Sequence, residues 1–584
     1  MRSSWKRRSV QRAEKQGCCG FVKAVGLTIK LCDAVKTRAS RGPPTSPGLG
    51  IHSPFEALFF TLHLHLNSSK LRSNSPSLHH GLCLNMALWT LVLLDPVSVF
   101  LLLALIFLMT FWFLSSSHGK PPLPLPPGPR PLPVIGNLNL IDIRRQDLSY
   151  MKLSEKYGPV FTVYLGFQKF LVLTGYEAVK EALTSKGNEF INRPPLPIFR
   201  QMQNGHGVIF ADGELWKATR RFTLASLRDL GMGKKRIEGK IQEELQILVE
   251  LIKSFKGEPF PLKTLTLAAT NVAYGIVFGD RFDYADETFL TLLKHIDEMV
   301  VRLGEPQLQV YNVYPFLGFL LKPHKIILDT MEKIRVILRE YLAAGKKRIN
   351  ENLLQNYYDY MLTKQQSEER SKDRNLFHDS NIVAAVFDLV LAGTETTGTT
   401  LQWAILLMMK YPHIQRQARE EIERVIGLER LPTCEDRKQL PFNNAIVHEV
   451  QRFASILQQF PRCTAVDTCF RGYFIPKGTP VIPSLTSVLY DKTQWETPTQ
   501  FNPNHFLDAE GNFVKKDAFL PFTIGRRNCP GESLALMEIF LFFVGLLQRF
   551  TFCPPPGKTV SDLDLTPEVT FTLRPQAYST CAVH

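Results

Sequence analysis

Cysteine is scarce in this sequence, and the motifs that depend on paired cysteines are missing. Its 584 residues include 10 cysteines, with no Cys-x-x-Cys pair and no Cys/His spacing suited to zinc. These absences exclude a disulfide-stapled scaffold and a zinc-ribbon domain, and they favour a reducing compartment for the main body. Phosphate-binding loops, a dinucleotide fingerprint and internal repeats are missing too. With 45% hydrophobic residues, the chain can still bury a large core.

Positive charge is concentrated at the front of the chain. The formal net charge is +15, but residues 1–85 hold 13 Lys and Arg against 3 Asp and Glu, which leaves only +5 for residues 86–584. The body has no basic stripe with interleaved aromatic residues, so the sequence gives no support for nucleic-acid binding. Residues 1–85 show no sustained periodicity and are expected to be mostly disordered.

This basic extension has two interpretations. Its acid-poor, serine-containing composition resembles a mitochondrial transit peptide. Alternatively, the working protein starts at Met86 and residues 1–85 come from an over-long gene model, because positive charge on both sides of the following apolar run would otherwise compete for the same side of a membrane. N-terminal sequencing of the natural protein distinguishes the two.

A long apolar run follows Met86. Asp95 is the one charged residue between Ala87 and Leu114, and residues 97–114 are 18 consecutive uncharged, mostly apolar residues. This length predicts a membrane anchor over residues 86–118, with a cleaved signal peptide or a buried core helix as alternatives. The proline-rich residues 119–134 are expected to form a stiff, extended spacer, and residues 135–584 form the main domain.

Apolar periodicity in the main domain is mostly helical. Residues 224–253 and 381–410 are long periodic stretches, each predicted to be helical. Residues 160–165 and 170–173 flank a glycine-containing turn and predict a short β region.

One cysteine stands in an unusual loop near the C-terminus. The segment reads Pro521-Phe-Thr-Ile-Gly-Arg-Arg-Asn-Cys-Pro-Gly531. Gly525 and Gly531 are expected to supply the backbone freedom for a loop around Cys529. A helix is predicted from about Glu532, and its positive N-terminal end would stabilise a thiolate. A lone cysteine in such a turn is usually only a buried thiol.

The combination Phe522, Gly525, Arg527, Cys529 and Gly531 is far more specific, and it resembles the haem-binding loop of the cytochrome P450 family. The resemblance implies that Cys529 is the thiolate ligand of the haem iron. It further implies that Phe522 covers the sulfur and that Arg527 pairs with a haem propionate.

A polar cluster lies within the apolar residues 381–410. Ala392-Gly-Thr-Glu-Thr-Thr397 combines residues of low helix propensity with hydroxyls that bond back to carbonyls, which predicts a break and a local widening of the helix. Alone, this pattern indicates a capped helix junction. It also resembles the family's oxygen-binding helix, which implies that Thr396 hydrogen-bonds bound dioxygen, that Glu395 relays protons and that Ala392 lies against the haem. Asp388 is expected to tie down a neighbouring loop.

Glu449 and Arg452 share one helix face, where an ion pair by itself means little. The family buries such a pair and adds a third partner from a downstream Pro-x-x-Phe segment. Here that segment is Pro503-Asn-His-Phe506, so the resemblance implies His505 as the third member, although Asn504 replaces the usual acid.

Haem propionates need cations, and the resemblance supplies them from separate elements. Trp216 and Arg220 match the family's Trp-x-x-x-Arg pair at one propionate, and Arg462 is expected to add a further contact. Together with Arg527, these residues would place positive charge at one edge of the haem.

The resemblance covers essentially residues 86–584 and is closest to the vertebrate microsomal members that handle xenobiotics, fatty acids and steroids. It implies a mainly α fold with small β-sheets, haem b, and insertion of one oxygen atom of O2 into a lipophilic substrate.

Since no flavin or NADPH motif is present, the resemblance implies electrons from NADPH through a membrane-bound NADPH–cytochrome reductase, with cytochrome b5 as an additional donor. Lys217, Arg221 and Arg526 are the expected reductase contacts.

The implied location is the endoplasmic reticulum membrane with a cytoplasmic catalytic domain, or the mitochondrion if residues 1–85 are real. By resemblance the pocket draws on residues 197–210, 304–316, 387–392, 456–460 and 570–573. Its apolar lining is expected to include Phe387, Leu391, Ile456, Leu457, Phe460 and Phe571. Two other functions stay open: a haem-thiolate isomerase or dehydratase that acts on a peroxide substrate, and a haem-binding protein without turnover.

Overall fold

The structure, a computed structural model, describes residues 96–115, 124–348, 354–371 and 376–584. The predictions for residues 1–85 lie outside the described residues. The chain divides into two units, Met1–Phe111 and Trp112–His584, and the second holds the domain discussed below.

Helix α4 (Pro96–Ser115) forms over the predicted apolar run. Its described side chains are mostly apolar and exposed, with Phe100 at 70% and Phe107 at 69% of full exposure. Among the described residues, one helix is long and apolar enough to cross a membrane, namely α15 (Asp379–Lys410), but 78% of its most apolar stretch is buried. Helix α15 is therefore a core helix.

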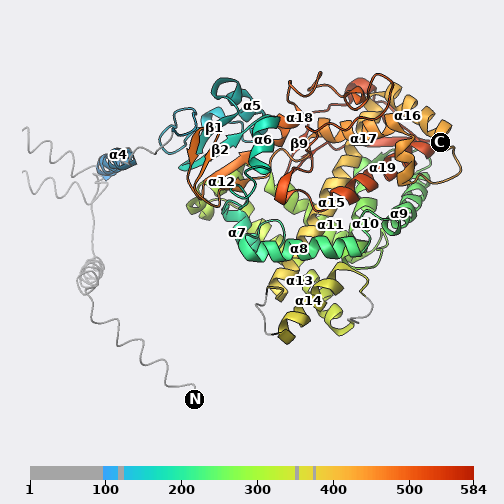
Figure 1. Cartoon of the computed structure of the whole chain (residues 1–584), viewed down its shortest axis with the longest axis horizontal. Coiled ribbons are helices and arrows are strands. Elements are labelled where there is room, and N and C mark those ends of the chain that lie inside the picture. Colours follow the sequence, from blue (N-terminus) through green and yellow to red (C-terminus); the bar gives the residue numbers. More distant parts are fainter. Residues whose placement is uncertain (1–95, 116–123, 349–353, 372–375) are drawn as a thin grey trace, which may run out of the picture. The chain divides into compact units, whose positions relative to one another are not determined.

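The main domain is largely helical (Figure 1). Its α-helices after α4 are α5 (Gln146–Tyr157), α6 (Tyr176–Leu183), α7 (Pro197–Gln203), α8 (Gly213–Asp229), α9 (Lys235–Ser254), α10 (Leu265–Val277), α11 (Glu287–Leu303), α12 (Pro306–Val313), α13 (Pro323–Arg348), α14 (Tyr357–Ser371), α15, α16 (Pro412–Val425), α17 (Pro441–Ala454), α18 (Leu485–Leu489) and α19 (Glu532–Arg549). Short 3-10 turns include η3 (Pro315–Phe319), η5 (Pro503–Phe506) and η6 (Gly525–Arg527).

The sheets are small. The largest has the order β1-β2-β7-β4, formed by β1 (Val160–Leu165), β2 (Gln168–Leu173), β7 (Pro480–Pro483) and β4 (Arg462–Cys463). Strands β1 and β2 pair antiparallel, which confirms the predicted β region. A three-stranded sheet joins β3 (Phe260–Pro261), β11 (Ser579–Val583) and β8 (Thr551–Cys553), and two hairpins join β5 (Thr468–Phe470) to β6 (Tyr473–Ile475) and β9 (Glu568–Val569) to β10 (Leu573–Arg574).

Helix α15 runs through its whole length without interruption, so the predicted break at residues 392–397 is wrong. The hydroxyls of Thr396 and Thr400 donate to the carbonyl oxygens four residues earlier, at 2.8 Å each, which leaves the helix intact. The glycine has a packing role instead: a Cβ on Gly393 would lie 2.5 Å from Cβ of Ala273, so its absence lets α10 approach closely.

The predicted helix over residues 224–253 is divided between α8 and α9. Gly231 and Gly233 separate them, with φ angles of +98° and +78° that favour glycine. The helical spacing of apolar residues did not indicate this turn, because apolar residues continue on both sides of it.

Part of the proline-rich segment is packed against the domain. The backbone N–H of Thr162 in β1 donates to the carbonyl of Pro127 at 2.7 Å, and that of Phe474 donates to the carbonyl of Pro124 at 3.2 Å. The segment is thus docked from Pro124 onward rather than standing free as a spacer.

Candidate functional site

The Cys529 loop lies where η6 leads into α19. The backbone N–H of Cys529 donates to the carbonyl of Phe522 at 3.0 Å, which closes the loop. Gly525 has a φ of +82°, and a Cβ there would lie 1.9 Å from the carbonyl oxygen of Leu183, so only glycine fits. The predicted freedom at Gly531 is wrong: its φ of −96° is open to any residue.

The Cys529 thiol is deep in the protein, yet part of its surface is open. Burial raises the pKa of this thiol to about 11, although N–H groups of Gly531 and Glu532 and the charge of Arg220 favour the thiolate. The N–H donors come from the start of α19, as predicted. A bound metal ion would supply the further positive charge that this buried thiol needs in order to ionise.

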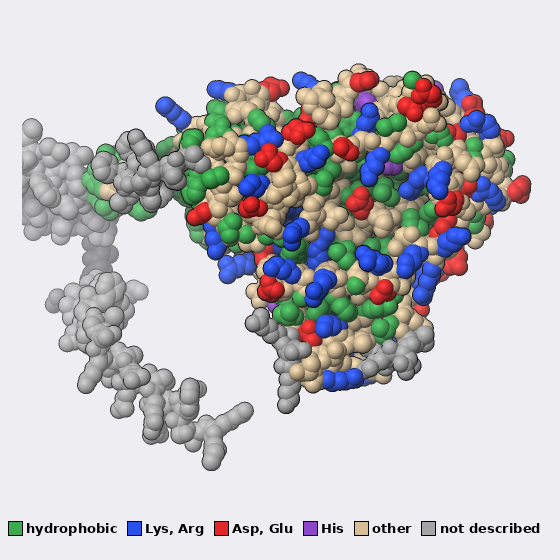
Figure 2. All heavy atoms as spheres, in the orientation of Figure 1, with side chains coloured by type: hydrophobic (Ala, Val, Ile, Leu, Met, Phe, Trp, Pro, Cys, Tyr) green, Lys and Arg blue, Asp and Glu red, His purple; other side chains and the backbone are tan. Residues whose placement is uncertain are grey.

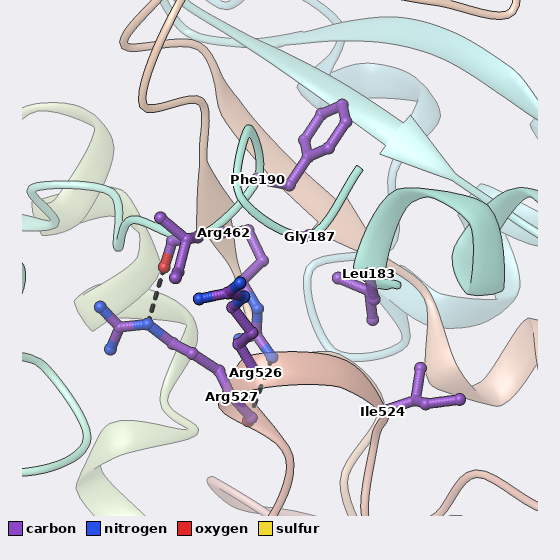
Figure 3. A pocket seen from close by; sticks show the side chains of 8 residues that line it. Leu183, Gly187, Phe190, Arg462, Ile524, Arg526 and Arg527 are labelled. Carbon is purple, nitrogen blue, oxygen red and sulfur yellow. Dashed lines mark hydrogen bonds between the residues drawn. The ribbon is translucent and has the colours of Figure 1, made fainter. Parts of the chain in front are cut away.

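Four arginines gather beside this loop: Arg193, Arg220, Arg462 and Arg527. Arg462 is 2% exposed, and its guanidinium makes just two long hydrogen bonds, to the carbonyls of Phe460 at 3.2 Å and Arg527 at 3.4 Å. Figure 3 shows Arg462 and Arg527 side by side at a small pocket that they line. Burial, together with the charges of Arg527 and Arg220, lowers the pKa of Arg462 to about 9.

Negative charge in this cluster is insufficient. Asp212 pairs with Arg527 at 2.5 Å, whereas no carboxylate among the described residues forms an ion pair with Arg193, Arg220 or Arg462. A buried cation without a counter-ion costs several kcal/mol. The cluster therefore fits an anionic group of more than one charge, such as a pair of propionates.

The predicted propionate residues take different positions in this cluster. Arg220 donates to the carbonyl of Asn528 at 2.6 Å and so braces the Cys529 loop. Trp216 stacks mainly on Arg527, whose guanidinium carbon lies 3.9 Å from the ring centre, against 6.0 Å for Arg220. Arg193, which the sequence analysis missed, lies 4.0 Å above the ring of Phe460.

Helix α15 has one partly open stripe along an otherwise buried surface. Leu389, Ala392 and Thr396 are partly accessible, as is Gly393 on the side that packs against α10, whereas their other helical neighbours from Phe387 to Thr397 are buried. This spacing of three and four residues defines a single face. An internal helix with one accessible face borders an interior space, as an oxygen-binding helix must.

Of the six predicted pocket residues, four have open surface and two do not. Ile456, Leu457, Phe460 and Phe571 are partly accessible. Phe387 at 0% and Leu391 at 6% exposure belong to the packed core, because they lie off the open face of α15. Their role as pocket residues stays a prediction that this packing does not support.

Four phenylalanines from separate segments form a closed ring of contacts. Phe199 stacks on Phe210 with ring centres 4.2 Å apart, and Phe571 lies 6.3 Å from Phe199. Phe460 completes the ring at 6.2 Å from Phe210 and 6.5 Å from Phe571. Three of the predicted pocket segments thus meet in this phenylalanine ring, which gives one wall of the site an aromatic surface.

Asp388 ties down the loop before α8, as predicted. Its carboxylate accepts hydrogen bonds from the N–H groups of Val208 at 2.7 Å and Ile209 at 2.9 Å, and from the amide of Gln203 at 2.8 Å. This loop carries Phe210, so Asp388 indirectly positions the phenylalanine ring.

Asp388 should give the protein a defined pH dependence. Burial raises its pKa to about 7, although the hydrogen bonds from Ile209 and Val208 oppose the shift. Because an unfolded Asp titrates near pH ~4, its contribution to the free energy of unfolding is fully present below that pH and is lost as pH rises through about 7. Asp388→Asn removes the titration, so the thermal midpoint of the wild type should fall relative to this variant between about pH 5 and about pH 7.5. Parallel curves would contradict this assignment.

Glu449, Arg452 and His505 are brought together in a fully buried network. Arg452 forms a bidentate pair with Glu449 at 2.7 and 2.8 Å, and both side chains are 0% exposed. His505 in η5 approaches Glu449 at 3.2 Å. Asn504 is exposed and takes no part through its side chain.

A buried thiol at a helix N-terminus, a surplus of buried guanidinium groups and an open face on a core helix fit the class of haem-thiolate proteins. Comparisons with known proteins give the family. The family model described as Cytochrome P450 matches residues 126–582. Cytochrome P450 2W1 of Homo sapiens is 50% identical over 487 residues, which cover 83% of this chain and 99% of the relative.

Two further relatives agree. Cytochrome P450 2K1 of Oncorhynchus mykiss is 44% identical over 496 residues, 84% of this chain and 98% of that protein. Cytochrome P450 2C5 of Oryctolagus cuniculus is 43% identical over 495 residues, 84% of this chain and 100% of that protein. The chain belongs to the cytochrome P450 family, and this membership identifies it as a monooxygenase and implies a haem group.

Proposed function

We propose that this chain holds haem b through Cys529 and inserts one oxygen atom of O2 into lipophilic substrates. The observation that carries the proposal is the deep, partly open Cys529 thiol beside guanidinium groups that have too few carboxylate partners. Bound haem would supply the activation of dioxygen. The protein supplies the binding, the orientation and the protons.

Each group of residues then has a role. Arg193, Arg220, Arg462 and Arg527 would bind the two propionates, and Phe522 and the N–H groups at Gly531 and Glu532 would surround the sulfur. The open stripe through Ala392 and Thr396 would face the haem. Thr396 and Glu395 would transfer protons there. Glu449, Arg452 and His505 would hold the backbone around the Cys529 loop without touching the substrate.

The phenylalanine ring supports a lipophilic substrate. Phe199, Phe210, Phe460 and Phe571 offer aromatic faces and no hydrogen-bonding groups. Apolar or aromatic substrates gain binding free energy from contact with such a wall. A polar substrate would lose its hydration there without forming new hydrogen bonds. Fatty acids, steroids and aromatic xenobiotics all meet this requirement.

A membrane location is part of the proposal. Residues 86–118, with α4 at their centre, would form the anchor. The main domain itself carries an exposed apolar patch around Tyr314, whose hydroxyl donates to the carbonyl of Val134 and whose ring contacts Phe167 and Phe316. The exposed side chains of this patch include Leu132, Val134, Ile135, Phe167, Phe316, Phe319 and Leu320. Exposed apolar clusters of this kind favour contact with lipid. The resemblance to microsomal family members suggests that this membrane is the endoplasmic reticulum, with the catalytic domain on its cytoplasmic face.

Electrons would reach the haem from NADPH–cytochrome reductase, or from cytochrome b5, at a basic surface near Cys529. Lys and Arg side chains gather over α8 and toward α9 (Figure 2). Arg221 and Arg526 are exposed there. Lys217 is exposed too, but it pairs with Glu214 at 2.8 Å, so its charge is partly neutralised.

Reversing charge on this surface should slow electron delivery alone. For Arg526→Glu and Arg221→Glu together, we expect reductase-supported turnover to fall about tenfold at low salt, with a smaller difference at high salt, because surface charges act mainly on association. Turnover driven by an organic hydroperoxide, which bypasses the reductase, should be unchanged. Lys156→Glu, an exposed lysine on α5, is the matched control. Equal losses with reductase and hydroperoxide would contradict the docking assignment.

The function is tested by two measurements on the full-length protein in membranes. A carbon-monoxide difference spectrum of the reduced protein reports whether a thiolate is bound to haem. NADPH-dependent oxidation of a panel of fatty acids, steroids and aromatic xenobiotics, in the presence of reductase, then reports monooxygenation. A thiolate spectrum with peroxide rearrangement but no NADPH-dependent product would favour the isomerase alternative, and a spectrum with neither activity would favour a non-catalytic haem protein.

A further inference from the structure

Glu395 is held by Arg574 of β10, by Thr572 just before that strand and by Thr399 of its own helix. Its carboxylate accepts two hydrogen bonds from Arg574 in β10, at 2.8 Å from Nε and 2.5 Å from Nη2. Thr572 donates to it at 2.5 Å and Thr399 at 3.2 Å. With four such donors around a side chain that is 7% exposed, Glu395 is held in one orientation.

Arg574 also connects this buried site to the surface. Its Nη1 lies 2.8 Å from Asp297 in α11, and Asp297 in turn pairs with Lys263 at 2.7 Å. Side-chain exposure rises along this series, from 7% at Glu395 to 13% at Arg574, 32% at Asp297 and 62% at Lys263. The guanidinium is thus shared between an inner and an outer carboxylate.

The charge of Arg574 is secured by this arrangement. Burial lowers its pKa, but the hydrogen bond and negative charge of Glu395, with those of Asp297, reverse the effect and raise it. Arg574 therefore stays positive and cannot itself pass a proton. It can only determine where the two carboxylates point.

Glu395 and Thr396 are not joined to each other in this arrangement. The Thr396 hydroxyl donates to the carbonyl of Ala392 at 2.8 Å, and each Glu395 oxygen is engaged by Arg574 or its neighbours. A proton relay through Glu395 requires its carboxylate to leave Arg574, and Asp297 is a second acceptor already in contact with that guanidinium.

We propose that Arg574 is a positioning residue for proton delivery, which releases Glu395 toward the open face of α15 as its guanidinium shifts to Asp297. On release, Glu395 takes up one proton from water on the Asp297 side and passes one proton to the Thr396 oxygen, while Thr396 gives its own hydroxyl proton toward the dioxygen that the monooxygenase reaction reduces. Glu395 is then again a carboxylate and Thr396 again a neutral hydroxyl. This inference rests on the proposed relay role of Glu395.

Arg574→Gln tests the proposal in the full-length haem protein. A buried carboxylate that loses its cation takes up a proton, so an infrared band of a protonated carboxyl should appear that is absent from the wild type. The double variant Arg574→Gln/Glu395→Gln should lack this band. Since the Glu395 of this variant no longer alternates between the guanidinium and the open face of α15, its proton delivery is no longer directed. The amount of product per NADPH consumed should therefore fall about tenfold, within the range typical of positioned acid–base groups, with a matching rise in hydrogen peroxide.

Arg281→Gln is the matched control, because Arg281 pairs with the buried Glu244 at 2.8 Å far along the chain from the relay residues. It should leave the product yield per NADPH unchanged. Arg574→Lys retains a cation and should recover part of the yield. If Arg574→Gln fails to fold, Asp297→Asn provides the test, since it preserves the inner pair and should still lower the yield without a new infrared band.

Unchanged product yield in both Arg574→Gln and Asp297→Asn would overturn the proposal. A loss of yield in Arg574→Gln without a Glu395-dependent infrared band would also overturn it, since that result indicates a structural role only. Failure of the proposed function would be seen separately, as a missing thiolate spectrum in the wild type.

Discussion

Cys529→Ser should remove the thiolate-type spectrum of the reduced, carbon-monoxide-bound protein and lower NADPH-dependent oxidation by more than about a hundredfold, the loss already seen when an outer partner of a metal ligand is removed. A serine hydroxyl is a much weaker donor to iron than a thiolate, and no longer pushes electron density onto it. The substitution changes one atom, so the loop closed by the Cys529 N–H and the Phe522 carbonyl should persist. Haem content and the spectrum are the measurements.

Cys434→Ser is the matched control for this substitution. Like Cys529, Cys434 is a free, half-buried cysteine, and burial raises its pKa to about 11 as well. Cys434 lies just before Glu435 and Asp436. Among the described residues it has no neighbouring group of four arginines like the one beside Cys529. This variant should retain the full spectrum. A thiolate spectrum that survives in Cys529→Ser would rule out residue 529 as the ligand.

Local patterns in the sequence predicted the elements that depend on local interactions. The apolar period of residues 381–410 corresponds to α15, and the N-terminal end of α19 falls at Glu532 as expected. Strands β1 and β2 follow from alternation around a glycine turn. The error within α15 has a physical reason: its threonine hydroxyls satisfy carbonyls inside the helix and its glycine permits contact with α10, so residues of low propensity are tolerated by tertiary packing.

The site was predictable where a motif is compact and not where partners are distant in sequence. The Cys529 loop and the pair of Glu449 and Arg452 rest on short segments. The partners of Asp388, in contrast, lie about 180 residues away, and the sequence predicted a tethered loop without identifying it. Arg574 reaches Glu395 across 179 residues, and Arg193 meets Pro461 across 268. An isolated arginine carries no local signal of such a contact, because the fold alone brings the two segments together.

The same distinction explains the pocket. The predicted segments around residues 199–210, 460 and 571 do converge in the phenylalanine ring. Phe387 and Leu391 were assigned from their apolar character, but apolar residues on a core helix can face either the packed interior or the open stripe. Only the rotation of α15 about its axis decides between them, and sequence alone leaves that rotation undetermined.

Arg452→Met should yield no folded haem protein. The Arg452 guanidinium is 0% exposed and bonds not only to Glu449 but also to the carbonyls of Leu489, Pro498 and Gln500, at 2.7 to 2.8 Å. Methionine fills similar space but leaves the buried Glu449 carboxylate without its guanidinium partner, which costs about 3–5 kcal/mol. Carbonyls that lose their partner add about 1–3 kcal/mol each. Against a typical stability of about 5–15 kcal/mol, the sum suffices to unfold the domain.

Arg430→Met is the control, because Arg430 forms an equally close bidentate pair with Asp436, at 2.7 Å for both contacts, while its own side chain is 48% exposed. The Asp436 carboxylate keeps its hydrogen bonds from the backbone N–H and the hydroxyl of Thr433, at 2.7 and 2.9 Å, and the exposed Arg430 site opens to water, so the cost should stay well below that of Arg452→Met. Protein yield and haem content in membranes measure both variants. If Arg452→Met gave normal holoprotein, the network of Glu449, Arg452 and His505 could not be what fixes the backbone from Leu489 to Gln500.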